Sequence, residues 1–164
     1  MGDARRASTP PELFIDADAV HTVCRRFITE EFKKIGVRNA ILGLSGGIDS
    51  ALVAFLTADA IGADRLRTYI LPYRTSATSS RDDALAVAHA LGCSVEEVPI
   101  SAGVDAVEAS LPAGTPITPI QRGNIAARMR MITLYHESAR HDGIVMGTGN
   151  KSEAMIGYTT LHVE

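Results

Sequence analysis

The sequence predicts a doubly wound α/β domain, a Rossmann-like parallel sheet with helices on both faces. The order of the expected elements predicts it. Short apolar runs alternate with segments of helical length along nearly the whole chain, and this order gives parallel strands joined by right-handed crossovers. The length of 164 residues suits one domain. We expect residues 1–12 to form a loose arm and residues 13–164 to form that domain.

The expected elements follow from periodicity and capping. The first helix, residues 16–36, has an apolar stripe, with aspartates at its start and lysines at its end that match the helix dipole. Near the start of another helix, Ser79 and Asp82 stand at capping-box spacing. The remaining predicted elements are strands at residues 40–44, 66–71, 95–100 and 143–146, and helices at residues 49–61, 79–91, 104–110 and 121–139.

Composition and charge narrow the class of protein. Hydrophobic residues make up 46% and charged residues 21%, which is ordinary for a soluble globular protein. The net charge of −3 gives no electrostatic reason to expect a nucleic-acid partner, and no apolar run approaches the roughly 20 residues that cross a bilayer. We therefore expect a cytoplasmic protein without a nucleic-acid or membrane partner.

A glycine-rich loop follows the first predicted strand. Its sequence is Ser45-Gly46-Gly47-Ile48-Asp49-Ser50. The paired glycines allow a tight turn, and the start of the next helix adds partial positive charge, so a phosphate is the expected ligand. A Walker-type loop is excluded because no lysine ends the motif. An aspartate beside phosphates needs a bridging cation, so Asp49 is interpreted as a Mg²⁺ ligand.

A second polar loop, Gly147-Thr148-Gly149-Asn150-Lys151-Ser152-Glu153, follows the fourth predicted strand. If the first and fourth strands are neighbours, Glu153 would lie near Asp49 and complete a magnesium site. Composition alone favours equally a polar loop that caps a helix beginning near Ser152. For Lys151 two interpretations are equally favoured, contact with a ligand and an exposed surface charge.

These motifs resemble a known family. The string from Ser45 to Ser50 matches the pyrophosphate-binding loop of the N-type ATP pyrophosphatases, which have the adenine nucleotide α-hydrolase-like fold. The second loop, followed by Gly157-Tyr158, resembles the signature of ammonia-dependent NAD synthetases. Residues 122–131 resemble that family's interface helix, and residues 71–76 resemble its second-strand loop.

The resemblance implies an enzyme, a ligase that forms a C–N bond. ATP and Mg²⁺ would activate deamido-NAD (nicotinic acid adenine dinucleotide) as an adenylate, releasing pyrophosphate, and ammonia would displace AMP to give NAD. No side-chain nucleophile is implied, and the protein would be a homodimer that uses helix 121–139. The implied ligands are Gly43, Leu44, Ser45, Gly46, Gly47, Ile48, Asp49, Ser50, Arg74 and Thr148 for ATP, Arg128 for deamido-NAD, and Asp49 and Glu153 for Mg²⁺.

Two arginines carry alternatives. On a helical wheel Arg128 falls among Ile125, Met129, Ile132 and Tyr135, so we expect its guanidinium on the buried face and Arg130 nearly opposite. A buried guanidinium needs an anion, which would be a structural carboxylate or the substrate. Arg74 lies in a loop that suits ATP binding, but a solvated arginine fits that position about as well.

Alternative functions also remain open. The fold suits a GMP synthetase or a tRNA-modifying relative, although no basic patch supports tRNA. Members of the family continue well beyond Leu161, where many place a substrate-binding lysine, so we expect that this chain lacks the family's C-terminal part. A truncated ATP-binding domain with little or no activity is therefore the third interpretation. The source of ammonia is left open.

Overall fold

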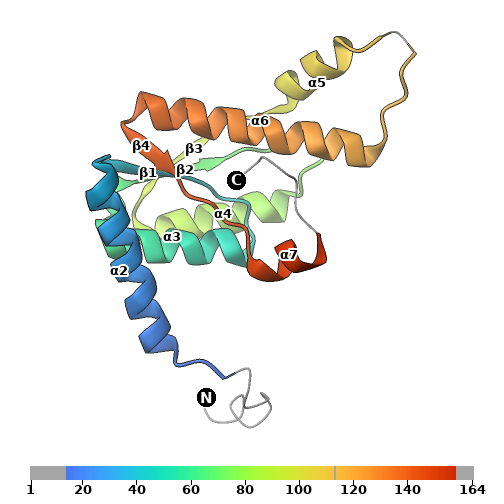
Figure 1. The fold of residues 1–164 in the computed structure, drawn as a ribbon. Helices are drawn as coiled ribbons and strands as arrows, with labels where there is room; N and C mark the ends of the chain where they lie inside the picture. The colour runs from blue at the N-terminus through green and yellow to red at the C-terminus, as the bar shows by residue number, and fades with distance from the viewer. Residues whose placement is uncertain (1–13, 113, 158–164) are drawn as a thin grey trace.

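The protein is a four-stranded parallel sheet between two layers of helices (Figure 1). We describe it from a computed structural model, over residues 14–112 and 114–157. The strands stand in the order β3-β2-β1-β4, and every neighbouring pair is parallel. The predicted doubly wound fold is thus confirmed. The strands are β1 (Asn39–Gly43), β2 (Leu66–Ile70), β3 (Ser94–Glu97) and β4 (Gly143–Val145).

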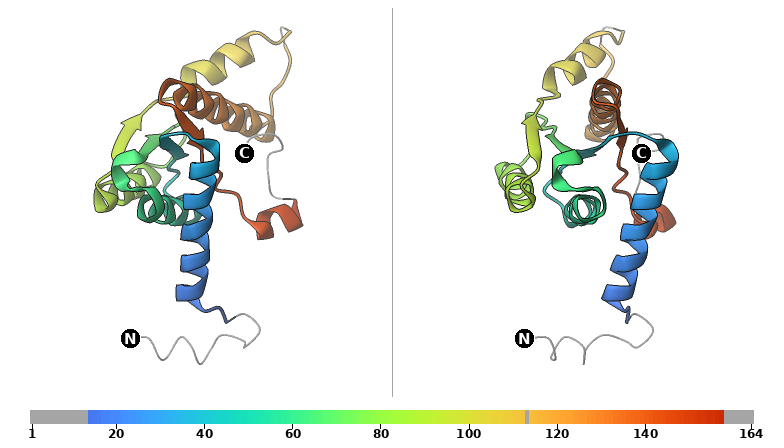
Figure 2. Two further views of the ribbon diagram at one scale, coloured as in Figure 1. Left: turned by 60° about the vertical axis from the view of Figure 1, so that its left-hand side comes forward. Right: turned by 90° about the vertical axis from the view of Figure 1, so that its left-hand side faces the viewer.

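Helices cover both faces of the sheet (Figure 2). One face carries α3 and α4, with α2 packed beside α3, and the other face carries α5 and α6. None of the helices in the described ranges is long and apolar enough to cross a membrane. The helices are α2 (Ala17–Ile35), α3 (Ile48–Ile61), the short 3-10 turn η2 (Ala63–Arg65), α4 (Thr78–Leu91), α5 (Ser101–Ala109), α6 (Pro119–Arg140) and α7 (Lys151–Ile156).

Strand β1 is buried on both faces. Side chains alternate along a strand, so Ala40 and Leu42 pack toward α3 and α4, whereas Ile41 packs toward α5 and α6. All three are fully buried, at 0% relative exposure. Tyr69 of β2 is also fully buried and packs on the same side as Ile41. Two separate hydrophobic cores therefore fix the central strand and the loop that follows it.

Several element boundaries differ from those predicted. Helix α4 begins at Thr78 with Ala77 as its N-cap, and no side chain caps it, so the capping box predicted at Ser79 is wrong. Helix α5 begins at Ser101 rather than 104, and strand β3 ends at Glu97 rather than 100. The predicted arm at residues 1–12, and the positions Tyr158 and Leu161, lie outside the described residues.

Candidate nucleotide-binding site

The strand order places a switch point between β1 and β4. The chain leaves β1 toward β2 on one side, while β4 pairs with β1 on the other, with Asn39 opposite Gly143. The register continues past the strand ends, where the Met146 amide donates to the Ile41 carbonyl at 2.9 Å. Ligands of doubly wound sheets bind in the crevice at such a point. The two predicted loops therefore meet where a ligand is expected.

The loop after β1 is held by its own hydroxyl groups. Ser50 Oγ donates to the Gly47 carbonyl at 2.9 Å and lies 3.1 Å from Ser45 Oγ. Ser45 Oγ in turn accepts the Gly47 amide at 3.2 Å. Both serines are among the implied ATP ligands, and in the structure their hydroxyls bond within the loop and shape it. The first amides of α3 remain for an anion, because a helix cannot satisfy them internally.

Gly46 has a backbone conformation that requires glycine. Its φ is +80°, in the left-handed region, and a Cβ atom built on it would lie 2.3 Å from the Ser80 carbonyl oxygen. The loop therefore packs directly against the start of α4. Gly47, at φ −84°, is the N-cap of α3 and has an ordinary extended conformation.

The loop after β4 brings the two predicted metal ligands near each other. Asn150 caps α7 in a capping box: its Oδ1 accepts the Glu153 amide at 2.8 Å, and the Glu153 carboxylate accepts the Asn150 amide at 3.2 Å. Asn150 Nδ2 also donates to Asp49 Oδ1 at 3.4 Å. Asn150, which the sequence analysis did not single out, thus links Asp49 to Glu153. Within the described ranges no group of three or more His, Cys, Asp or Glu is arranged to hold a metal.

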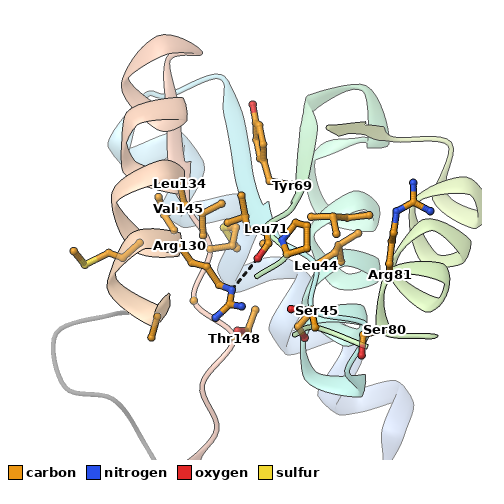
Figure 3. Close-up of a pocket in the computed structure, with 18 of the residues that line it drawn as sticks. Leu44, Ser45, Tyr69, Leu71, Ser80, Arg81, Arg130, Leu134, Val145 and Thr148 are labelled. Carbon is orange, nitrogen blue, oxygen red and sulfur yellow. Dashed lines mark hydrogen bonds between the residues drawn. The ribbon is translucent and has the colours of Figure 1, made fainter. Parts of the chain in front are cut away.

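A cavity of about 590 Å³ opens beside these loops, between α4 and α6 (Figure 3). Four of the predicted ATP ligands line it, namely Gly43, Leu44, Ser45 and Thr148. The residues from Gly46 to Ser50 do not line it. Together with Ser45 they form the adjoining glycine-rich loop, residues 45–50, which we call the anion loop. Much of the remaining wall is apolar, with Leu71, Met131, Leu134, Val145 and Met146.

The prediction that Arg128 lies on the buried face of its helix is wrong. Arg128 is exposed, and its guanidinium donates to the Asn124 carbonyl at 3.1 Å. Arg130, predicted to point away, is partly buried and lines the cavity. The wheel failed because α6 turns polar side chains toward the sheet, where they have partners. Glu137 accepts the Tyr69 hydroxyl at 3.0 Å, and Arg130 Nε donates to the Leu71 carbonyl at 3.0 Å.

Arg74 lies outside the large cavity. It forms an ion pair with Asp105 and lies over the Tyr73 ring, 5.4 Å from its centroid. It lines a second cavity of about 510 Å³, together with Glu108 and Arg122. The structure thus separates Arg74 from Ser45 and Thr148. Lys151 is exposed as the first residue of α7.

The parallel sheet, the glycine-rich loop at the start of α3 and the cavity at the switch point are the arrangement typical of α/β domains that bind phosphate-bearing ligands. The sequence identifies the particular family. Residues 20–164 match the NAD synthase family, so the chain belongs to it.

Two of the curated relatives illustrate the match. The chain is 41% identical over 152 residues to the NH(3)-dependent NAD(+) synthetase of Chlorobaculum parvum. The alignment covers 93% of this chain and 54% of the relative. The synthetase of the same name from Trichlorobacter lovleyi is 41% identical over 150 residues, covering 92% of this chain and 54% of the relative. The chain therefore spans about half the length of the curated relatives it matches.

Solved structures agree with the family. The NH3-dependent NAD synthetase of Campylobacter jejuni superposes with a TM-score of 0.84 at 34% identity, over 90% of this chain and 63% of that one. A glutamine-dependent NAD+ synthetase from Acinetobacter baumannii, solved with ADP, gives 0.83 at 32% identity, over 87% of this chain and 28% of that one. An NMN synthetase from Francisella tularensis gives 0.82 at 27% identity, over 90% of this chain and 60% of that one.

Proposed function

We propose that this protein uses ATP and Mg²⁺ to amidate deamido-NAD with ammonia, giving NAD, AMP and pyrophosphate. Membership of the NAD synthase family supports the reaction class. The observation that carries the proposal is the meeting of the two loops at the switch point, where Asn150 joins Asp49 at 3.4 Å. The two loops are far apart in the sequence. Together they offer backbone amides, hydroxyl groups and carboxylates, the groups that would bind a nucleoside triphosphate with its Mg²⁺.

The proposed reaction has two steps. A carboxylate oxygen of deamido-NAD bonds to the α-phosphorus of ATP, and the bond from that phosphorus to the β-phosphate oxygen breaks, releasing pyrophosphate. Ammonia then bonds to the activated carbonyl carbon, the bond to AMP breaks, and one proton is released. The chain's contribution is positioning and stabilisation of phosphate charge by backbone amides. The residues from Gly43 to Ser50 and Thr148 would hold ATP.

Asp49 and Glu153 would hold Mg²⁺. The residues fit this ion, because Mg²⁺ is usually bound by one or two carboxylates together with substrate phosphates and water. Both carboxylates are oriented by Asn150, one through its side-chain amide and the other through the capping box. When bound, the ion would neutralise charge on the phosphates.

Deamido-NAD would bind at the outer face of α6 in a homodimer. Arg128 is exposed there, beside Ile132 and Tyr135, whose relative exposures are 53% and 51%. An exposed apolar stripe that also carries a cation suits an interface that binds an anionic substrate. Arg74 is the weakest of the proposed ATP ligands, because it would have to leave Asp105 to reach ATP. A cytoplasmic location accords with these substrates.

The test is NAD formation from deamido-NAD, ATP and ammonium, with ATP binding measured in parallel by titration calorimetry. Asp49→Asn should abolish the Mg²⁺-dependent part of ATP binding and lower the rate at least about 100-fold, the loss expected for a group that stabilises transferring phosphate. Asp59→Asn, on the same helix but in an exposed contact with His21, is the matched control and should change neither.

Three outcomes would count against the proposal. An unaffected Asp49→Asn rate would refute the metal role. Pyrophosphate release only with nicotinic acid mononucleotide, XMP or tRNA would assign another substrate. ATP binding without any NAD formation would favour the interpretation as an ATP-binding domain with little or no activity.

A further inference from the structure

Arg130 lies at the polar end of the large cavity. Its side chain extends from α6 toward Thr148, and both residues, with Ser45, line the same space (Figure 3). Arg130 Nε donates to the Leu71 carbonyl at 3.0 Å. This bond uses one edge of the guanidinium and fixes its plane. Two amino groups of the fork remain for other acceptors, because a guanidinium carries five N–H donors.

Among the described residues, the cavity wall offers Arg130 no carboxylate. No Asp or Glu is among the residues that line it in the described part of the chain. The other arginine on the wall, Arg81, already pairs with Glu97 at 2.8 Å. Burial lowers the pKa of Arg130, since a cation removed from water without a counter-charge is costly. The free-energy cost of burying this guanidinium would fall if an anionic ligand bound beside it.

The cavity wall indicates which part of a nucleotide would meet Arg130. Leu44, Leu71 and Leu134 supply an apolar surface suited to a base. Ser45 marks the beginning of the anion loop, where the terminal phosphates would sit. A nucleotide that spans from the apolar wall to that loop places its first phosphate between the two, near Thr148 and Arg130.

We infer that Arg130 binds the α-phosphate of the nucleotide, as a ligand distinct from the anion loop. This inference rests on the proposed function and names a residue that donates to the oxygens of the phosphate at which the reaction takes place. Arg130 would stay with that phosphate when pyrophosphate leaves, and would hold the AMP portion of the adenylate while ammonia attacks.

The test compares the affinities of adenosine, AMP and ATP, because AMP carries the α-phosphate alone. In the wild-type chain AMP should bind more tightly than adenosine. Arg130→Met should weaken AMP and ATP about 10- to 100-fold, the range of a hydrogen bond to a charged group, and change adenosine less than about threefold. Arg130→Lys keeps a cation without the planar fork and should recover part of the AMP affinity. Arg26→Met, in an exposed pair with Glu30 on α2, is the matched control.

The outcomes separate this inference from the proposed function. Equal weakening of adenosine and AMP by Arg130→Met would assign a structural role through Leu71 and overturn the inference, as would unchanged AMP affinity. Failure of wild-type chain to bind any of the three nucleotides would count against the proposed function itself. Thermal melting of each variant shows whether it folds. If Arg130→Met does not fold, Arg130→Lys decides: AMP affinity equal to wild type overturns the inference, and a selective loss for AMP supports it.

Discussion

Gly46→Ala tests whether the anion loop depends on the close packing described at α4. The substitution forces a non-glycine residue to keep φ at +80°, and places its Cβ 2.3 Å from the Ser80 carbonyl oxygen. The left-handed conformation costs about 1–2 kcal/mol. Backbone movement to relieve the overlap costs about 1–3 kcal/mol more. We expect a total loss of about 2–5 kcal/mol in the free energy of unfolding.

Gly47→Ala provides the matched control for this measurement. Its φ of −84° suits any residue, and the nearest atom to a new Cβ would be Ser45 Oγ at 3.3 Å, the end of a side chain and not backbone. The assay is urea denaturation of both variants, with ATP titration of each. We expect Gly47→Ala to lose less than about 1 kcal/mol. Equal stability of Gly46→Ala and wild type would refute the packing argument.

Two further predictions concern α6. Burial alone would raise the pKa of Glu137, but the Tyr69 hydrogen bond and the charge of Arg140 outweigh it and hold the pKa below its ordinary value of 4.5. The resulting stabilisation is present above that value and is lost as pH falls through the folded-state pKa. Glu137→Gln should therefore destabilise the protein at pH 7 and less at pH 4, as followed by urea denaturation; a deficit independent of pH would contradict this. Ile132→Glu should shift the proposed homodimer to monomer in analytical ultracentrifugation, because it places a charge on the exposed apolar stripe; an unchanged mass would exclude this face as the interface.

The alternation of apolar runs and helical segments was enough to predict the sheet. Burial of β1 on both faces was readable because Ala40, Ile41 and Leu42 are consecutive apolar residues. The loop from Ser45 to Ser50 was readable for a different reason, since its glycines and its place after a strand define it locally. The proximity of Asp49 and Glu153 depends on the order of the strands in the sheet. The sequence pattern does not give that order, so the proximity was predicted only for the case in which the first and fourth strands are neighbours.

Helix α6 shows why the rest of the site was not predicted. A wheel argument assumes that the apolar side of a helix faces the sheet. Here Arg130 and Glu137 face inward and find polar partners, while Ile132 and Tyr135 are left outside. The sequence feature that could have indicated this is the pair Arg130 and Glu137, which lie on the same side of the helix, opposite the apolar stripe. A helix that packs on a ligand cavity and carries an exposed apolar stripe breaks the usual assumption on both sides.

The hydroxyl contacts of Ser45 and Ser50 have a consequence for recognition. Because these groups bond to each other and to Gly47, the loop already has its shape before any anion arrives. An anion that binds there would gain affinity from this prior order, since little chain entropy would be lost on binding. Recognition would then depend on the direction of main-chain amides, and the serines would act by keeping those amides aligned.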